Sequence, residues 1–283
     1  MVLFFWLLKV LQFANLYGNP MKLIVLLSDF GWKDGYAGIL KGVIWTIAPG
    51  VEISDLTHEI APQDVLQGAL TLGRSVSYFP AGTIFLAVVD PGVGTSRRPI
   101  AARIAEHFYV APDNGLITLL LDDAQRRGQP VEVVHLNRPQ FWLPTISNVF
   151  HGRDIFAPVA AALANGVPLA DLGDRIHDPL RLKLPLPVRI EGGWRGEIIH
   201  IDAFGNLATN LRAEHLHGRG QIEVHVGPES IRRQVQAFGE GAPGQLVTLI
   251  DSSGALAVSA VNGSAERCLA AHIGDPVEVW FIT

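Results

Sequence analysis

The segment that decides the fold is TIFLAVVDPGVG, which runs from Thr83 to Gly94. Its first part, Thr83–Val89, is apolar almost throughout rather than alternating, which is typical of a β-strand covered by helices on both faces. Leu23–Leu27 is a second run of this kind, and Val65–Tyr78 between the two predicts a helix. The order strand, helix, strand predicts a βαβ unit within a parallel sheet.

The same alternation extends outward from this unit, from Met21 to about Ile176. Phe108–Ala111 predicts a third strand, and the alanine-rich Ile155–Asn165 predicts a helix that is capped by the glycine after it. We therefore expect a largely parallel α/β domain over residues 21–181.

A proline-containing segment, Leu182–Pro187, predicts the domain linker, because proline cannot continue a helix and biases the residue before it toward extended geometry. Beyond it the helical patterns mostly give way to short β-type runs at 196–201, 221–226 and 276–281. Residues 188–283 therefore predict a smaller antiparallel β-domain, a barrel or a sandwich.

The first twenty residues carry an apolar run, Val2–Leu8, which is too short to cross a bilayer. Lys9 interrupts the apolar character, and no small-residue cleavage site of a signal peptide follows. Because Met21 directly precedes a strong strand, we expect residues 1–20 to be an N-terminal extension from a start codon assigned too early, with the protein beginning at Met21.

Composition excludes several classes of partner. The chain has 283 residues, of which 48% are hydrophobic and 17% charged, and its net charge is −5 with lysines and arginines scattered, so we expect a soluble protein without a nucleic-acid or membrane partner. Cys268 is the single cysteine, which excludes an internal disulfide framework and fits a reducing cytoplasm. The ten histidines show no compact ligand spacing, so no metal site is expected.

Polar residues collect where the predicted strands end. Ser28–Gly31, Asp90–Arg98 and Pro112–Gly115 each place an acid near a glycine directly after a strand, the edge of an open α/β sheet where ligands bind. One such acid is usually only part of a turn. Three carboxylates at one edge need hydroxyls or cations to bind, because like charges raise one another's pKa. Arg97 and Arg98 are the nearest cations, and a guanidinium can hold Asp90 ionised through a bidentate pair.

His151 lies in the segment Phe150–Asp154, directly before the helix that starts at Ile155. A lone histidine is more often structural, but the cluster of histidine, arginine and aspartate beside a glycine is equally typical of a functional site. Both interpretations stay open on the residues alone. The other histidines lack such surroundings.

Taken in order, the motifs SDFG (28–31), VVDPGVG (88–94), APDNG (111–115) and FHGRD (150–154) resemble those of the S-adenosylmethionine hydroxide adenosyltransferases. The resemblance continues through DAFGN (202–206) and SSG (252–254), so it spans nearly everything from Met21 onward. The halogenases that make fluoro- or chloro-deoxyadenosine are relatives of this family.

This resemblance implies an N-terminal α/β domain, a C-terminal β-barrel and a homotrimer that holds its substrate between the first domain of one subunit and the second domain of its neighbour. It implies that Asp90, Arg97 and His151 form a triad that activates the attacking water. Asp29 matches the acid that grips the ribose hydroxyls, and Asn114 is expected among the substrate contacts.

In the second domain, the resemblance assigns further substrate contacts. Asp202 and Asn206 match positions that hold the methionine amino group and the adenine, and Phe204 packs between them. Ser252 matches a contact to the methionine carboxylate.

Several departures separate the chain from the halogenases. His151 and Gly152 stand where the fluorinating relatives carry tyrosine and serine, and Ile104–His107 passes directly into the next strand without their long insertion. Val149 replaces the threonine usual before Phe-His-Gly. Ser253 stands where those relatives have arginine, which leaves carboxylate binding partly unexplained.

The expected activity is hydrolysis of S-adenosyl-L-methionine to adenosine and L-methionine by in-line attack of water at the ribose C5′, with no cofactor. We expect Arg97 to orient Asp90 and to lower its pKa, and the residues leave open which triad member accepts the proton. The alternatives are a halogenase of the same fold and a non-catalytic module that binds adenosine or S-adenosylmethionine. A phosphate-ester hydrolase is disfavoured, because the loop 92–97 lacks the lysine and spacing of a P-loop.

Overall fold

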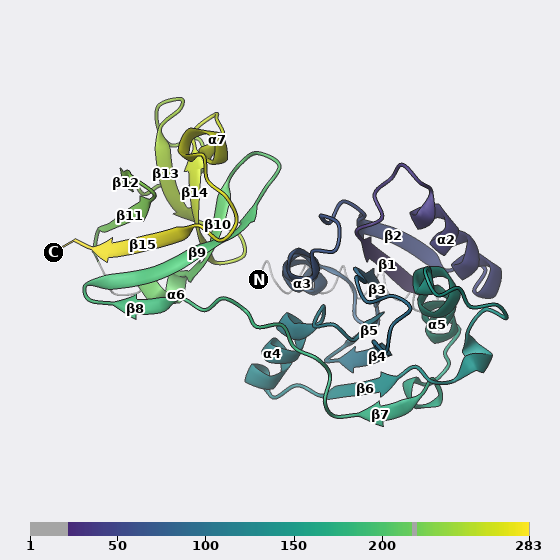
Figure 1. The fold of residues 1–283 in the computed structure, drawn as a ribbon. Helices are drawn as coiled ribbons and strands as arrows, with labels where there is room; N and C mark the ends of the chain where they lie inside the picture. The colour runs from purple at the N-terminus through teal and green to yellow at the C-terminus, as the bar shows by residue number, and fades with distance from the viewer. Residues whose placement is uncertain (1–21, 217–219, 283) are drawn as a thin grey trace, which may run out of the picture. The chain divides into compact units, whose positions relative to one another are not determined.

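The computed structural model describes residues 22–216 and 220–282, so the expectation for residues 1–20 lies outside the described residues. The chain forms two compact units, the first ending at Leu182 and the second beginning at Lys183 (Figure 1). Each unit is built around cores of its own.

The first unit contains one seven-stranded sheet in the order β2-β1-β3-β5-β4-β6-β7. Its strands are β1 Leu23–Ser28, β2 Glu52–Thr57, β3 Ile84–Val88, β4 Pro99–Ile104, β5 His107–Pro112, β6 Val131–His135 and β7 Asp174–Ile176. The neighbours β2, β1, β3 and β5 pair in parallel, whereas β4, β6 and β7 join through antiparallel pairs. The antiparallel half arises because a two-residue turn at Ala105–Glu106 folds β4 directly onto β5, so Ile104 pairs with His107.

Helices cover both faces of this sheet, which gives three layers. They are α2 Tyr36–Ile47, α3 Val65–Ser75, α4 Thr118–Arg127 and α5 Ala157–Ala164, with short helices η1 Val76–Tyr78, η2 Pro139–Phe141, η3 Gly152–Phe156 and η4 Leu169–Asp171. Figure 1 shows α2 and α5 on one face and α3 and α4 on the other. The continuously apolar strand pattern correctly predicted burial on both faces.

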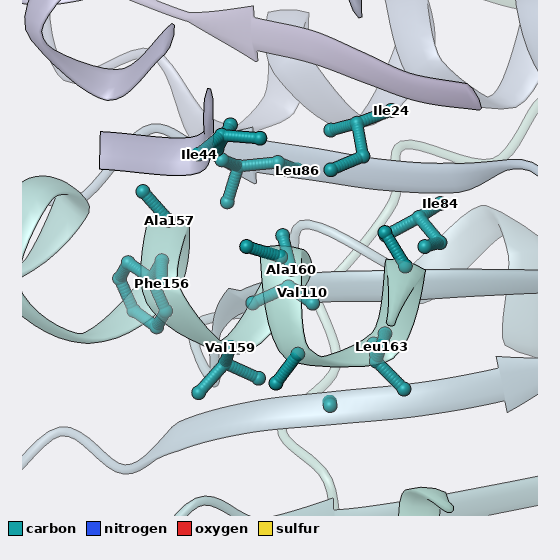
Figure 2. Packing of buried hydrophobic residues seen from close by; sticks show 14 of the residues in the cluster. Ile24, Ile44, Ile84, Leu86, Val110, Phe156, Ala157, Val159, Ala160 and Leu163 are labelled. Carbon is teal, nitrogen blue, oxygen red and sulfur yellow. The ribbon is translucent and has the colours of Figure 1, made fainter. Parts of the chain in front are cut away.

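Alternate residues of each central strand enter different cores. Ile24 and Leu26 of β1 pack toward α2 and α5, whereas Val25 and Leu27 pack toward α3 and α4. Figure 2 shows the first of these cores, where Ile44 of α2 and side chains of α5 lie against strand residues. Complete burial of one such side chain stabilises the fold by about 1.5–3 kcal/mol. The loops at the strand ends are therefore anchored to a well-packed core.

The second unit is an antiparallel sheet in the order β12-β11-β15-β9-β10-β14-β13, with β8 paired to β9. Its elements are β8 Val188–Ile190, β9 Gly193–Ile201, β10 Leu207–Arg212, α6 Ala213–Leu216, β11 Ile222–Val226, β12 Glu229–Ile231, β13 Leu246–Ile250, β14 Ala255–Ala260, α7 Ala265–Leu269 and β15 Pro276–Phe281. A β-bridge between Gln234, just after β12, and Thr248 of β13 joins the two ends of the sheet. The sheet is therefore a nearly closed barrel, and the α/β plus β-barrel fold class is confirmed.

Candidate active site

The parallel strands bring the polar motifs to one edge of the sheet. Because β1, β3 and β5 pair in parallel, the residues that follow each of them, including Asp29, Asp90 and Asp113, lie at their common carboxyl edge. The three acids do not share one partner: each has donors of its own, so their mutual repulsion is compensated separately.

Asp90, Arg97 and His151 contact one another directly. The Arg97 guanidinium forms a bidentate pair with the Asp90 carboxylate, in which Nε donates to Oδ1 at 3.0 Å and Nη2 donates to Oδ2. The same Nη2 lies 3.1 Å from Nδ1 of His151. Arg97 therefore links a carboxylate and an imidazole that are separated by sixty-one positions in sequence.

Close backbone packing brings the two loops of this cluster together. Gly94, in the loop between Asp90 and Arg97, has a φ of +75°, and a Cβ on it would lie 2.1 Å from the carbonyl oxygen of Asn148. Glycine is required there because a side chain would strain the backbone and would push away the loop that leads to His151.

The cluster is removed from solvent. The side chains of Asp90 and Arg97 are each only 6% exposed, and the guanidinium carbon of Arg97 lies 5.2 Å from the centre of the Phe156 ring. Within the described part of the chain, Nη1 of Arg97 is buried without a hydrogen-bond partner, so the guanidinium keeps donors for a ligand.

Burial raises the pKa of the Asp90 carboxyl above its ordinary value of 3.8, although Arg97 and His151 oppose the rise. Arg97 lowers the pKa of Asp90 as expected, but burial outweighs this effect, so the net shift is upward. The reason is that desolvation penalises the charged carboxylate more than the neighbouring cation stabilises it. A raised pKa makes Asp90 a better proton acceptor than a surface aspartate.

His151 is held as a neutral ring. Burial, and then the charge of Arg97, lower the pKa of His151 below its ordinary value of 6.5. Arginine can only donate hydrogen bonds, so Nδ1 of His151 must accept from Arg97, and the proton of the neutral ring is on Nε2. The ring therefore offers an N–H donor, and its accepting nitrogen is already occupied.

Two more of the expected site residues lie at the same edge. Asp29 is partly buried after β1 and accepts a hydrogen bond from the backbone N–H of Gln63 through Oδ2 at 2.8 Å. Asn114 donates through Nδ2 to the carbonyl of Val89 at 2.8 Å, so it joins the end of β5 to the residue before Asp90. Asp29 keeps Oδ1 for a ligand.

Two acids of the sequence motifs have structural roles instead. Asp113 is buried, pairs with Arg98, and accepts from the backbone N–H of Leu180 at 2.7 Å. Asp154 is fully buried within the π-helical turn η3 and pairs with Arg153 at 2.6 Å. Their charges are satisfied internally, so neither is a candidate for catalysis.

In the second unit, Asp202 organises a turn between β9 and β10. Its Oδ1 accepts from the backbone N–H groups of Phe204 and Asn206, both at 2.9 Å, and its Oδ2 accepts from Nδ2 of Asn206 at 2.8 Å. This cap leaves the Phe204 ring on the surface, 78% exposed. An exposed aromatic ring on a fixed turn is suited to stacking on a planar ligand.

In the loop after β13, Ser252 is exposed to solvent, whereas the hydroxyl of Ser253 is hydrogen-bonded within the loop. The hydroxyl of Ser253 donates to Asp251 at 2.7 Å, and Nη2 of Arg212 donates to the Ser253 carbonyl at 2.9 Å. Arg212 lies outside every sequence motif, about forty positions before this loop, so no sequence pattern indicates it. The structure therefore places a cation beside the position where the halogenases carry arginine.

Some kinds of site and span are absent from the described ranges 22–216 and 220–282. No group of three or more histidine, cysteine, aspartate or glutamate side chains is arranged to hold a metal ion. No helix in these ranges has both the length and the apolar character needed to span a bilayer.

Models of two protein domains match the chain. The SAM hydroxide adenosyltransferase N-terminal domain matches residues 24–173, and the corresponding C-terminal domain matches residues 196–278. The chain belongs to the SAM hydroxide adenosyltransferase family.

The curated proteins that this chain resembles include S-adenosyl-L-methionine hydrolases and fluorinases. The (R)-S-adenosyl-L-methionine hydrolase of Salinispora tropica is 40% identical over 92% of this chain and 98% of its own length. The protein of the same name from Thermus thermophilus is also 40% identical, over 92% of this chain and 100% of its own length. A fluorinase of an Actinoplanes species is 31% identical over 72% of this chain and 75% of its own length.

A solved structure of an uncharacterized conserved protein from Thermotoga maritima has the same fold. It superposes with a TM-score of 0.83 at 37% identity and covers 90% of this chain and 99% of its own. A conserved hypothetical protein from Thermus thermophilus superposes with a TM-score of 0.73, also at 37% identity, over 92% of this chain and 100% of its own.

This member of the SAM hydroxide adenosyltransferase family keeps the features that separate it from the halogenases. The turn between β4 and β5 consists of two residues, so no inserted segment is present there. A Cβ at Gly152 would lie 3.2 Å from the Phe30 ring, so a serine at this position would press on the residue that follows Asp29.

Proposed function

We propose that this protein hydrolyses S-adenosyl-L-methionine to adenosine and L-methionine. The observation that carries the proposal is the buried contact of Asp90, Arg97 and His151 at the carboxyl edge of the sheet. Family membership and the (R)-S-adenosyl-L-methionine hydrolases at 40% identity support the same reaction.

The chemistry requires help for the nucleophile rather than for the leaving group. The sulfonium departs as a neutral thioether, so the C5′–S bond breaks without a general acid and without a cofactor. Water attacks C5′ in line with that bond, its oxygen becomes the 5′-hydroxyl of adenosine, and it releases one proton. A positioned base that takes this proton accelerates such a step by about a hundredfold to ten-thousandfold.

The three side chains divide this work. Asp90 accepts the proton, because burial raises its pKa and its oxygens keep lone pairs beyond those that bind Arg97. His151 orients the water through Nε2–H, since its Nδ1 is bound by Arg97. Arg97 fixes both groups and favours the ionised form of Asp90, which releases the accepted proton to solvent after each turnover, so the three act as one unit.

The remaining expected residues bind substrate in this proposal. Asp29 accepts from the ribose hydroxyls, and Asn114 supports this edge through the strand end. Asp202 and Asn206 bind the methionine amino group and the adenine, with Phe204 packed between. Ser252 contacts the methionine carboxylate.

Arg212 supplies the positive charge that Ser253 lacks. It has no carboxylate partner among the ion pairs of the described residues, so its guanidinium is available for an anion. A guanidinium binds a carboxylate in bidentate fashion. In this proposal Arg212 therefore binds the methionine carboxylate together with Ser252.

We also propose a homotrimer in which the second unit of one copy completes the site of its neighbour, as the family resemblance implies. Exposed apolar residues on and near α2, such as Trp32, Tyr36, Ile39 and Trp45, support burial against another copy. The single cysteine supports a reducing, cytoplasmic location.

Subunit complementation tests the shared site. An Asp90→Ala chain and an Asp202→Ala chain are each expected to be inactive, but co-expressed mixed trimers contain sites made of two intact halves. Random mixing in a closed ring should restore about a quarter of the wild-type rate. No restored activity in mixed trimers that are verified by mass would contradict a site shared between copies.

The function itself is tested by incubating the purified protein with S-adenosylmethionine, prepared as each sulfonium epimer, with and without chloride or fluoride. Adenosine and methionine are the expected products, at a rate that halide does not change. A halogenated nucleoside would identify a halogenase, and binding without any product would identify a non-catalytic module.

A further inference from the structure

A second hydrogen-bonded cluster lies beside the proposed ribose site and has no part in the mechanism above. The Ser28 hydroxyl lies 2.6 Å from Nδ1 of His58, whose Nε2 lies 3.0 Å from Oδ1 of Asp55. Lys41 of α2 donates to the other oxygen of Asp55 at 2.5 Å. The sequence around His58 does not indicate this cluster, because Ser28 and Lys41 lie on separate elements.

Lys41 and His58 both donate hydrogen bonds to Asp55, and Ser28 donates to His58. Burial opposes ionisation of Asp55, but Lys41 and His58 outweigh it and hold the pKa of this carboxyl below its ordinary value. An ionised carboxylate only accepts, so Nε2 of His58 carries a proton, and in the neutral ring Nδ1 accepts the Ser28 hydroxyl proton. Each side chain therefore fixes the orientation of the next.

Ser28, His58 and Asp55 contact one another in the order of a catalytic nucleophile, base and acid. Their burial excludes a role for Ser28 as a nucleophile. Ser28 and His58 are both fully buried, and the Trp32 ring packs edge-on against His58 at 4.8 Å between centroids. A nucleophile must reach its substrate, whereas this hydroxyl faces only protein. The cluster therefore acts through a neighbour.

That neighbour is Asp29, which directly follows Ser28. The loop after β1 is tied to the loop after β2 by the N–H of Gly31, which donates to the His58 carbonyl at 2.7 Å, and by the N–H of Gln63, which donates to Asp29. Gln63 has a φ of +66°, a strained value for a residue with a side chain, and it persists only where surrounding contacts enforce it. Both ends of the Asp29 loop are thus fixed by the segment that carries His58.

We propose that Lys41, Asp55, His58 and Ser28 form a positioning relay that holds Asp29 for the ribose diol and thereby sets affinity for the nucleoside part of the substrate. This inference rests on the proposed binding of adenosine and ribose, and it adds four residues that do not touch the reacting atoms. Preorganisation by such supporting hydrogen bonds typically governs how well a first contact binds.

The test is a double-mutant cycle on adenosine affinity, measured by calorimetry. Ser28→Ala removes one hydroxyl with little change in volume, and we expect it to weaken adenosine binding about tenfold, within the range for residues in contact. In an Asp29→Ala background the same change should weaken binding less than about twofold, because the group it positions is gone. Ser75→Ala, which removes a hydroxyl bonded to the Thr71 carbonyl in α3, is the matched control and should change nothing.

A dideoxy ligand separates positioning from a general structural effect. The Ser28→Ala penalty should vanish for 2′,3′-dideoxyadenosine, which lacks the diol, and KM for S-adenosylmethionine should rise while kcat changes less than about twofold. An equal penalty with and without Asp29, or no penalty at all, would overturn the relay.

If Ser28→Ala does not fold, Lys41→Met at the partly exposed end of the relay replaces it, with an expected loss of about threefold in adenosine affinity. An unchanged affinity in Lys41→Met would then overturn the relay. Adenosine binding without hydrolysis by the wild-type protein would leave the relay standing and overturn the hydrolase proposal. A wild-type protein that does not bind adenosine would overturn both.

Discussion

The two units prepare their functional residues in opposite ways. In the first unit Asp90 and Arg97 are 6% exposed and bound to each other, whereas in the second unit Phe204 is 78% exposed on a turn that Asp202 caps. The first arrangement fixes chemical groups away from water before any ligand arrives, and the second presents a surface that a ligand must cover. We therefore expect substitutions of Asp90, Arg97 and His151 to act on the chemical step and substitutions in the second unit to act on binding.

The largest effect is expected for Asp90→Asn, which removes the proton acceptor but keeps the shape of the side chain. We expect kcat to fall by about a hundredfold or more with affinity largely unchanged. His151→Gln keeps an N–H donor and should lose less. Single-turnover rates and calorimetric affinities check both, with Asp113→Asn, after the neighbouring strand, as a control whose main effect is on stability. A His151→Gln loss larger than that of Asp90→Asn would contradict the assignment of Asp90 as acceptor.

Arg97→Met is expected to change the pH dependence of kcat/KM substantially. Asp90 must be ionised, so wild-type kcat/KM should fall as the pH drops through a pKa that burial raises above 3.8. Arg97 lowers the pKa of Asp90, so its loss should raise that pKa further and move the acid limb of kcat/KM to higher pH.

The control for this pH shift is Arg98→Met, the adjacent arginine, which pairs with Asp113 and should leave the acid limb where it is. An acid limb that Arg97→Met leaves in place, or moves to lower pH, would show that Asp90 is not the group that titrates.

These expectations also show where sequence was sufficient and where it was not. The strand at Ile84–Val88 was predictable because a continuous apolar run has few other stable arrangements, and parallel pairing then placed Asp29 and Asp90 at one edge. The meeting of Arg97 with His151 was expected only from the resemblance, since it depends on the close approach at Gly94.

Other features depend on three-dimensional contacts that short motifs do not reveal. Asp113 resembles Asp90 in sequence but is neutralised by Arg98 and by the backbone of Leu180. The sign of the pKa shift of Asp90 depends on burial, which the sequence does not give. His58 and Arg212 were missed because Ser28 lies thirty positions from His58 along the chain, and Ser253 lies forty-one positions from Arg212.

In the second unit, Arg212→Met should raise KM for S-adenosylmethionine about tenfold, because one charge-assisted contact to the carboxylate is lost. The variant should bind decarboxylated S-adenosylmethionine as well as the wild-type protein does, since that analogue has no carboxylate. Arg232→Met, which breaks an exposed pair with Glu223, is the control. Equal losses for the two ligands would remove Arg212 from the carboxylate site.

The smallest effect is expected for Phe204→Ala, which should weaken adenosine binding by about twofold to tenfold through lost stacking and leave Tm unchanged. Phe156→Ala provides the opposite case in the first unit. Its ring is fully buried, so its loss should destabilise the fold by about 3–5 kcal/mol. Thermal unfolding and calorimetry of both variants check this contrast between a binding residue and a core residue. A large drop in Tm for Phe204→Ala would contradict it.

The central claim is that this protein directs water onto the ribose C5′. The most direct measurement is turnover of S-adenosylmethionine in water labelled with heavy oxygen, followed by mass spectrometry of both products. We expect one label in the 5′-hydroxyl of adenosine and none in methionine. Unlabelled adenosine, or label in the amino-acid product, would contradict it.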